Sequence, residues 1–486
     1  MLKGLYFTVF IFILGFIVSS CYKEEFYEGN DLVLRFSTDT LTFDTVFTSR
    51  GSATRILKVY NDEDKAVKIS EIKIASNKNN QFRLNIDGLS SSTAKNVEIG
   101  AHDSIYIFAE THINPDDPLS VSPFIVSDSL LFFVNGNTQK VRLEAWGQNA
   151  NYIKTSEFGK LSCNMGEIIW DDPRPYIIYG ILRIDSCKLT LPSGTHVHMH
   201  GGIKKNIDGN FYYDGNIYVY KNGKLNINGT KEKPVIIQTD RLEKDYQDIN
   251  ALWYGIFFLP ESKGNKIKFA EIKNATIALY LDSLATLDVR NTKILHTGAW
   301  GLYSRHADVY AENCLFADIG SYNVIVDYGG NINMNYCTIY NNNTDDALVL
   351  KNYRCLDDEC TSIAAYPLNA KFTNCIIYGT NKDELLLSNG VKDDNSFFNY
   401  SFENCLIQVT DILKPQQFPY FFDNCKSCIN GKGENDLFIN PDKYNFRPDT
   451  TSIVIDKGKY ISLINTDLEL NQRDANPDIG CYEFIK

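Results

Sequence analysis

The chain has 486 residues, of which 44% are hydrophobic and 22% charged, and its 60 acidic and 48 basic side chains give a formal net charge of −12. This is the composition of a globular protein of roughly two or more domains, which excludes whole-chain disorder and a polytopic membrane protein. The sequence pI near 5.2 and the lack of a Lys/Arg run exclude a nucleic-acid partner, because phosphate contacts need clustered cations.

The amino terminus has the pattern of an export signal. Lys3 precedes an apolar run from Leu5 to Val18, which is short for a membrane span and typical of a signal-peptide core. The following Val18-Ser19-Ser20-Cys21 resembles the lipobox of bacterial lipoproteins, which implies cleavage before Cys21 and acylation of its thiol. Residues 1–20 are therefore predicted to be a lipoprotein signal peptide and residues 21–30 an acylated tether. A plain signal peptide or a signal anchor is the alternative.

The tether also carries a sorting pattern. Tyr22-Lys23-Glu24-Glu25-Phe26 is similar to the Lys-acidic-acidic signal that, in one group of Gram-negative bacteria, directs lipoproteins to the cell surface. The resemblance implies an outer-membrane protein that is anchored in lipid through Cys21 and exposed at the cell surface. The periplasmic leaflet is the alternative location.

Residues 31–150 contain about seven short alternating segments separated by turn residues. This pattern is typical of an antiparallel β-sandwich. The stretches Phe43–Val46, Gly51–Thr54 and Val59–Asn61 look like the immunoglobulin-like modules of bacterial surface proteins, which implies a spacer.

An internal repeat follows. Asn-Cys pairs occur at Asn313-Cys314, Asn374-Cys375, Asn404-Cys405 and Asn424-Cys425. Tyr336-Cys337 and Asn291-Thr292 take the equivalent places, and the second residue of each pair is called a ladder position. Cys314 follows Thr292 by 22 residues, and Cys337 follows Cys314 by 23. The two longer gaps correspond to one period plus inserted loops at 352–367 and 392–399, so the spacing indicates a coiled repeat.

The residues around each pair predict the shape of the coil. Val309 and Ala311 share one parity along the chain, whereas Cys314 and Phe316 share the other. Because strand side chains alternate between faces, all four can point inward only if the chain bends at Asn313. Asn tolerates the left-handed conformation that such a bend requires. The pattern predicts a right-handed parallel β-helix over residues 160–440; hairpins of coincident spacing are the alternative and lack turn signals at this period.

Two further regions carry family resemblance. Cys187–Thr195, Leu225–Thr230 and Trp253–Ile256 resemble the opening coils of pectin-lyase-like β-helix proteins. Asp478-Ile479-Gly480-Cys481-Tyr482-Glu483-Phe484 looks like the terminal cap of secreted bacterial β-helix proteins, with Cys481 where a smaller residue is usual. Residues 441–486 are therefore predicted to form a C-terminal cap, and the protein to be all-β.

Eleven of the twelve cysteines remain when Cys21 is acylated. Stacked ladder cysteines would have Cβ atoms ~4.8 Å apart, whereas a disulfide needs ~3.8 Å. The ladder cysteines are therefore expected to be reduced and buried. Cys355 and Cys360, within one inserted loop, are the disulfide candidate, while zinc binding lacks a nearby His partner.

The coil register also predicts which side chains line one outer edge. Eight residues after the ladder positions come Trp300, Tyr322, Asp345 and Asp383, and nine after come Gly301, Asn323, Asp346 and Glu384. Aromatic faces stack on sugar rings, and two aromatic side chains here lead into carboxylates. The four residues at the first of these positions, Trp300, Tyr322, Asp345 and Asp383, are therefore glycan-binding candidates. Arg305 and Asp327, thirteen after their ladder positions, are expected to be neighbours and to form a surface ion pair.

The acidic members of this edge suggest two kinds of chemistry. Paired carboxylates can act as acid and base in glycoside hydrolysis, which makes Asp345, Asp346 and Asp383 catalytic candidates. With Glu384 they are also weak calcium candidates. Asn343–Asp346 is similar to an Asn-Thr-Asp element of β-helix polygalacturonases, but the companion Gly-His-Gly and Arg-Ile-Lys elements are absent. Solvated acidic turns are the alternative reading.

The sequence favours a non-enzymatic surface lipoprotein whose β-helix binds a glycan or a partner protein. A polysaccharide lyase or glycoside hydrolase acting on an acidic glycan is the first alternative, and a purely structural envelope component is the second. No cofactor is expected, apart from the option of calcium.

Overall fold

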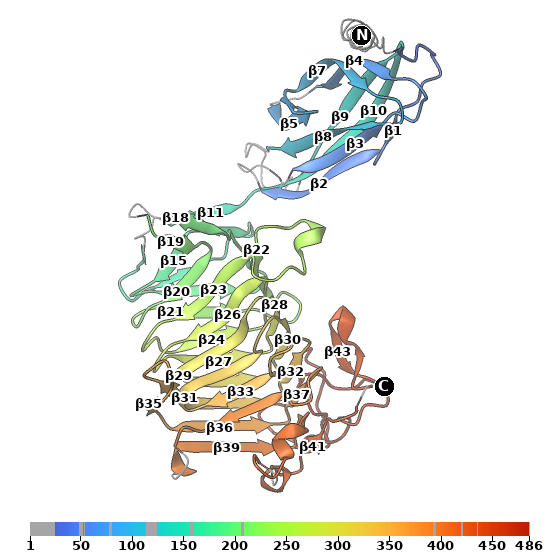
Figure 1. Cartoon of the computed structure of the whole chain (residues 1–486). Coiled ribbons are helices and arrows are strands. Elements are labelled where there is room, and N and C mark those ends of the chain that lie inside the picture. The colour runs from blue at the N-terminus through green and yellow to red at the C-terminus, as the bar shows by residue number, and fades with distance from the viewer. Residues whose placement is uncertain are drawn as a thin grey trace, which may run out of the picture. The chain divides into compact units, whose positions relative to one another are not determined.

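The computed structural model consists mainly of β-strands (Figure 1). It divides into two compact units, residues 1–149 with 242–244 and residues 150–241 with 245–486, and each unit has its own core. No helix among the described residues is long and apolar enough to span a bilayer. The predicted signal peptide and Cys21 lie outside the described residues. The structure describes residues 25–47, 52, 54–76, 80–112, 124–155, 160–205, 209–391, 395–418, 421–434 and 436–485.

Two five-stranded sheets form the amino-terminal unit, in the orders β1-β3-β8-β5-β6 and β2-β10-β9-β4-β7. Neighbouring strands are antiparallel, except that β2 and β10 are parallel. The strands are β1 Arg35–Phe36, β2 Thr40–Phe47, β3 Arg55–Tyr60, β4 Val67–Ile74, β5 Phe82–Ile86, β6 Leu89–Ser90, β7 Thr93–Ile99, β8 Ser104–Thr111, β9 Phe124–Val134 and β10 Asn137–Gln148.

Alternating side chains explain how these two sheets share one core. Leu57 from the first sheet and Ile72 and Phe132 from the second are fully buried together, because alternate residues of a strand point to the same face. Asn135 and Gly136 both have positive φ, as a two-residue hairpin turn requires between β9 and β10. The unit thus has two sheets over one core, and its assignment to the immunoglobulin-like class stays a prediction.

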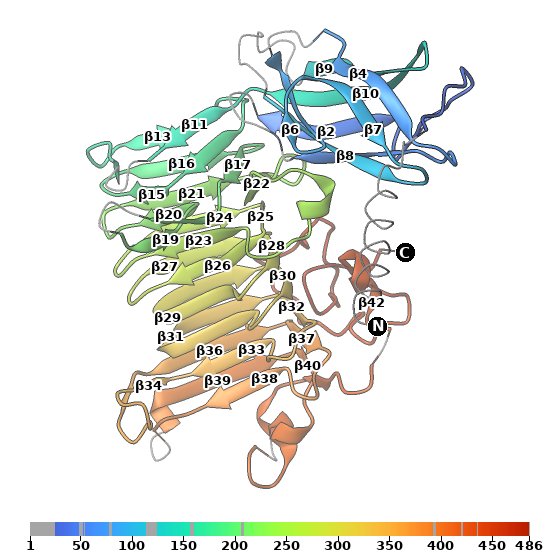
Figure 2. The same cartoon turned by 45° about the horizontal axis from the view of Figure 1, so that its top comes forward.

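The second unit is a parallel β-helix, as predicted, in which strands of successive coils stack side by side (Figure 2). Its three sides are called faces A, B and C in chain order. Face A contains β12 Lys160–Leu161, β15 Ile181–Ile184, β20 Asn216–Val219, β23 Trp253–Phe258, β26 Ala275–Leu281, the first halves of β29 Trp300–Glu312 and β31 Val324–Asn335, β33 Leu348–Lys351 and β38 Leu385–Ser388. Face B contains β13 Glu167–Ile169, β16 Lys188–Pro192, β21 Lys224–Asn228, β24 Asn265–Lys268, β27 Thr286–Arg290, the second halves of β29 and β31, β36 Leu368–Thr373 and β39 Phe398–Glu403.

Face C extends from β11 to β41 and begins at Asn151, earlier than the predicted start at residue 160. Its strands are β11 Asn151–Lys154, β14 Tyr176–Tyr179, β17 His196–Met199, β22 Val235–Thr239, β25 Ala270–Lys273, β28 Lys293–Thr297, β30 Leu315–Ile319, β32 Thr338–Asn341, β37 Ile376–Gly379, β40 Leu406–Ile407 and β41 Ile429–Asn430. Other elements are the hairpins β18 Ile203–Lys205 with β19 Phe211–Tyr213, β34 Tyr353–Cys355 with β35 Ile363–Ala365, and β42 Phe438–Asn440 with β43 Asn445–Pro448, and the 3-10 helices η3 Lys244–Tyr246, η4 Asn395–Phe397, η5 Asp411–Leu413, η6 Phe422–Asn424 and η7 Pro441–Lys443.

The bend between faces B and C lies at the residue where the inward-facing side chains change parity along the sequence, as predicted for Asn313. Five of the six residues before the ladder positions have φ between 47° and 57°: Asn291, Asn313, Tyr336, Asn374 and Asn404. The free thiols that follow are buried, with Cys314, Cys337, Cys375 and Cys405 fully so and Cys425 at 9% exposure. The left-handed bend therefore turns Cys314, Cys337, Cys375 and Cys405 into the core, whereas Asn424, before Cys425, ends the 3-10 helix η6 and does not form the predicted bend.

The carboxyl-terminal segment lies along the side of the coils, and its assignment as the predicted cap stays a prediction. Its residues Leu437, Phe446 and Ile479 pack against Leu315 and Ile376 of face C. The bend asparagines of successive coils donate to its backbone: Asn291 to Asp467 O (3.1 Å), Asn313 to Thr466 O (3.0 Å), Asn374 to Lys459 O (2.8 Å) and Asn404 to Lys457 O (2.8 Å). This segment, residues 437–485, is here called the clasping segment. It is hydrogen-bonded to several coils and holds them together.

The last coil is closed by a different stretch. Ile412 and Phe421, between β40 and β41, belong to the same core as the ladder thiols, and the Phe421 ring lies 5.7 Å from that of Phe402. These apolar side chains replace the coil that would otherwise follow.

Two disulfides form among the residues that the structure describes. Cys355 and Cys360, the predicted candidate pair, are joined within the loop that carries β34 and β35, with Cα atoms 4.6 Å apart. Cys163 and Cys187 form a second bond, with Cα atoms 5.0 Å apart, which the sequence analysis did not predict.

Candidate functional site

The predicted edge of face A exists, with a shift of one residue in one coil. Leu302 pairs with Val324, Val324 with Leu348 and Leu348 with Leu385. Two residues before these positions, the column along the edge contains Trp300, Tyr322, Asp346 and Asp383.

Asp345 is one residue outside this column, which corrects the predicted register. Leu348 follows Cys337 by 11 residues, whereas Val324 follows Cys314 by 10. The extra residue belongs to the turn before β33. Asp345 instead accepts a hydrogen bond from Ser321 Oγ at 2.6 Å.

The Asp383 carboxylate is hydrogen-bonded to backbone amides of the next turn. Its carboxylate accepts from the amide nitrogens of Thr410 (2.6 Å), Asp411 (3.0 Å) and Ile412 (3.2 Å) at the start of η5. These bonds satisfy amides that have no partner within a helical turn. Asp383 therefore holds the end-closing stretch, and both of its oxygens already accept backbone hydrogen bonds.

Glu384 is fully buried and also structural. It accepts from Asn341 Nδ2 (2.9 Å), Ala347 N (3.1 Å) and Asn381 N (2.7 Å). Burial raises its pKa to about 7, against the opposing effect of these bonds. A side chain without solvent access cannot meet a glycan directly.

Among the described residues, Asp346 is the candidate carboxyl at the edge for which no hydrogen bond or ion pair to another residue is seen, and it is half-buried. Burial, with added repulsion from Asp383 and Asp345, raises its pKa to about 6. Within the described ranges no group of three or more His, Cys, Asp or Glu is placed to hold a metal ion. Calcium binding by Asp345, Asp346, Asp383 and Glu384 therefore stays a prediction without a preformed site.

Trp300 belongs to a longer series of rings, here called the aromatic chain. Its members, in order of contact, are Tyr213, Tyr254, Phe257, Tyr280, Tyr303 and Trp300, with successive ring centroids 4.5, 4.9, 5.5, 5.1 and 4.6 Å apart. Tyr213 is on β19, and the others are on β23, β26 and β29 of face A. The 23-residue spacing of Phe257, Tyr280 and Tyr303 could have revealed this row from the sequence.

The geometry of the aromatic chain decides what it can offer a ligand. Tyr280 and Tyr303 are stacked with planes 12° apart, so each covers one face of the other. Among the described residues Trp300 contacts one other ring, Tyr303, and Tyr213 contacts one, Tyr254. Trp300 and Tyr213 thus each have a ring face without an aromatic partner, whereas Phe257, between them, is buried.

A row of alternating charges runs beside the aromatic chain. Arg305 and Asp327 lie on neighbouring strands, but the ion pairs differ from the predicted one. Arg305 contacts Asp282 at 3.8 Å, and Asp327 contacts Lys351 at 3.4 Å. The alternation leaves no strong field of one sign on this face.

Tyr303 ties this charged row to the aromatic chain. Its hydroxyl donates to Asp327 Oδ2 at 2.5 Å. Burial and this hydrogen bond raise the pKa of Tyr303 well above its usual value. The phenol therefore stays protonated at neutral pH and does not act as a base there.

Residues 254–412 match the family model described as "Right handed beta helix region", which agrees with the coils described above. No curated protein matches the chain significantly.

Three solved structures illustrate the structural likenesses. The catalytic unit of a thermostable GH87 alpha-1,3-glucanase from Streptomyces thermodiastaticus is 11% identical, with 72% of this chain and 74% of that chain covered and a TM-score of 0.30. The ASH/PapD-like domain of human CEP192 is 8% identical, covers 27% and 97%, and has a TM-score of 0.19. A protein of unknown function from Porphyromonas gingivalis is 11% identical, with a TM-score of 0.18; the match takes in 28% of this chain and 59% of that one. Scores this low carry no argument about function.

Proposed function

We propose that face A binds a glycan without cleaving it. The observation that carries this proposal is the aromatic chain, which crosses three neighbouring strands of face A and ends at Trp300 beside Tyr322. Terminal ring faces can stack on sugar rings, while the hydroxyl groups and the charged row can bond to sugar hydroxyls. The ring column gives a repeated set of contacts along the coil axis, as a linear polymer requires.

The carboxylates argue for binding rather than turnover. Hydrolysis needs two accessible acid groups flanking one bond. Asp383 is bonded to three backbone amides and Glu384 is buried, which leaves Asp346 without an accessible acidic partner in the column.

Catalysis is the second candidate because of one observation, the raised pKa of Asp346 at about 6. A carboxyl with a pKa near 6 is protonated in part of the molecules just below neutral pH, and such a pKa suits a general acid. Asp346 also lies in the same column as Trp300 and Tyr322. A lyase or hydrolase acting on an acidic glycan is the form this alternative takes.

Affinity electrophoresis with a panel of soluble polysaccharides tests the proposal. We expect Trp300→Ala to weaken binding of the retarding glycan about tenfold, a loss of about 1.4 kcal/mol. Trp146→Ala removes an exposed tryptophan of the amino-terminal unit and serves as the matched control. Equal retardation of wild type and Trp300→Ala by every glycan would exclude this face as the binding site.

Product analysis separates binding from catalysis. We expect wild type to release neither new reducing ends nor unsaturated sugars from a bound glycan. Products that disappear in Asp346→Asn would establish the enzyme instead. If no glycan binds and the protein co-purifies with envelope proteins, the structural role is favoured.

We also propose that Cys21 anchors the protein in the outer membrane, facing outward. The lipobox and the Lys-acidic-acidic pattern support this location, and two or more acyl chains give stable anchoring. Labelling with an alkyne fatty acid should mark wild type and spare Cys21→Ala. Protease treatment of intact cells should digest wild type, whereas Glu24→Ala/Glu25→Ala should be protected if the acidic pair directs surface exposure.

A further inference from the structure

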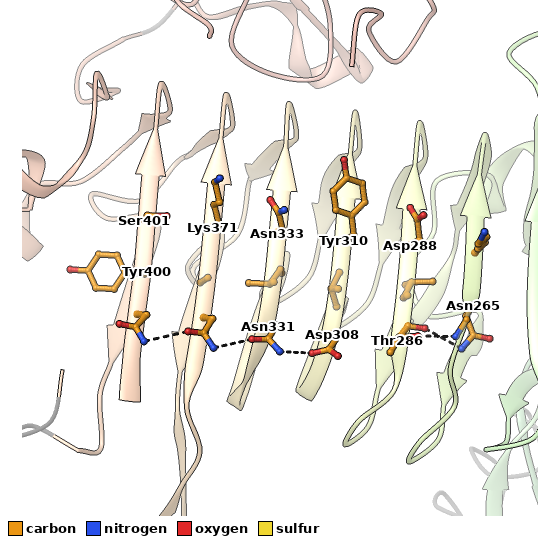
Figure 3. Close-up of a pocket in the computed structure, with 18 residues that line it drawn as sticks. Asn265, Thr286, Asp288, Asp308, Tyr310, Asn331, Asn333, Lys371, Tyr400 and Ser401 are labelled. Carbon is orange, nitrogen blue, oxygen red and sulfur yellow. Dashed lines mark hydrogen bonds between the residues drawn. The ribbon is translucent and has the colours of Figure 1, made fainter. Parts of the chain in front are cut away.

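A groove on face B is separate from the aromatic chain on face A. It crosses six strands, β24, β27, β29, β31, β36 and β39, and has a volume of ≈590 Å³ (Figure 3). This volume falls within the ~300–1,000 Å³ of typical ligand pockets. Six strands at the usual spacing give it a length of about 24 Å along the coil axis.

One wall of the groove is a row of hydrogen-bonded side chains, here called the amide row, made of Asp308, Asn331, Asn369 and Asn399. All four are exposed. Asn399 donates to Asn369 (3.3 Å), Asn369 to Asn331 (2.9 Å) and Asn331 to Asp308 (2.6 Å) (Figure 3).

The amide row keeps unused bonding capacity. An amide has two N–H groups and two oxygen lone pairs, and the row uses one of each at Asn331 and Asn369. These two side chains therefore fix one another's orientation while each presents a further donor and a further acceptor to the groove. Their orientation is set before a ligand arrives, which lowers the entropy cost of binding.

A second row lies two residues further along each strand, about 7 Å from the first. It contains Lys266, Asp288, Tyr310, Asn333, Lys371 and Ser401. Tyr310 donates to Glu312 (2.7 Å), and Asp288 is held by two bonds from Arg290 (2.6 and 3.0 Å). The intervening Leu287, Val309 and Ile332 are buried, so the floor between the rows is mainly backbone.

The charges of the groove select the class of ligand. Lys266 and Lys371 are matched by Asp288 and Asp308, so the lining has no excess of cations to attract a polyanion. Amides that both donate and accept are complementary to hydroxyl groups, which do the same. We propose that this groove is a second binding site and takes an uncharged glycan chain that lies along the coil axis.

The test uses the full mature protein with laminarin, dextran and xyloglucan as neutral probes and alginate and polygalacturonate as acidic ones. We expect at least one neutral probe to retard wild type in affinity electrophoresis. The double variant Asn331→Ala/Asn369→Ala should weaken that binding at least tenfold. Asn342→Ala is the matched control, because Asn342 also donates to a carboxylate of the neighbouring coil, Asp318 (3.1 Å), and lies outside the groove.

A measurement on wild type keeps the test valid if the double variant is unstable. Saturating neutral glycan should protect Lys266 and Lys371 from acetylation and leave the exposed Lys221, outside the groove, unchanged. Trp300→Ala should retain both the binding and the protection, which distinguishes this site from the one proposed on face A.

Three results would overturn the inference. The first is that no neutral glycan binds; the second is that binding depends on Trp300 and not on the amide row; the third is that only acidic polymers depend on the amide row. The second result would leave the function proposed for face A intact.

Discussion

Arg473 shows how a single residue holds the clasping segment onto the coils. Its side chain is completely buried and forms an ion pair with Glu483. It also donates to Asn313 Oδ1 (2.9 Å) and Gly480 O (3.1 Å), and its guanidinium lies 3.7 Å from the centre of the Tyr336 ring. One cation thus joins the bend residues of two coils to the last residues of the chain.

Replacing Arg473 should therefore be costly. We expect Arg473→Met to lower the free energy of unfolding by about 3–5 kcal/mol, because the buried Glu483 carboxyl loses its cationic partner and must either stay charged in the core or take up a proton. Arg447→Met is the control: its pair with Glu469 is half-exposed, and such pairs contribute under ~1 kcal/mol. Urea denaturation followed by fluorescence measures both, and similar losses for the two variants would contradict the assigned role.

Glu384 makes stability depend on pH. Its pKa is raised from 4.5 to about 7 in the folded protein. Between these values the unfolded chain releases the proton while the folded protein keeps it, so stability falls as pH rises from about 4.5 to 7.

We expect Glu384→Gln to remove this contribution, so that the variant gains about 3 kcal/mol relative to wild type between pH 4.5 and 7. The gain is read from urea denaturation at each pH, which cancels any constant cost of losing one acceptor. Glu232→Gln, at an exposed carboxylate, should leave the pH profile unchanged. A constant difference between Glu384→Gln and wild type would show that the carboxyl keeps its ordinary pKa.

At the scale of the element, the bend between faces B and C combines two separable effects. Asn374 has a φ of 57°, and its amide both donates to Lys459 O (2.8 Å) and accepts from Lys459 N (2.7 Å). Asn374→Gly should lose only the two bonds, whereas Asn374→Ala should add about 1–2 kcal/mol of left-handed strain.

The ranking of these two variants in thermal unfolding tests the argument. Ala should be less stable than Gly, although Ala is favoured almost everywhere else in folded proteins. The reverse order would mean that the bend does not need a left-handed residue.

These bends were predictable because a change in side-chain parity at Asn313 is local in the sequence. The position of Asp345 was not, since one extra turn residue before Leu348 shifts the register and leaves no composition signal. The amide row was hidden for a related reason: the inserted loop 352–367 separates Asn331 from Asn369 by 38 residues. The side-on position of the last segment follows from contacts of Asn291 to Asn404 with residues far along the chain, which no local pattern encodes.

At the scale of the whole molecule, the stacked coils form one continuous core in which each coil contacts mainly its neighbours. Such repeats can open from an end or unfold as one unit. The clasping segment bonds to coils from Asn291 to Asn404, and this favours unfolding as one unit because no coil in that range can leave without breaking it.

The free thiols report which behaviour occurs. Cys314, Cys337 and Cys375 are fully buried. Cys428, which follows the last ladder position Cys425, is half-buried. We expect iodoacetamide to label Cys428 rapidly in the native protein, and the three inner thiols to react together, at the rate of global unfolding seen by circular dichroism. Mass spectrometry of peptides locates the label, and Cys428→Ala controls for its position. Faster labelling of Cys375 than of Cys314 would show instead that the coils fray from the carboxyl-terminal end despite the clasp.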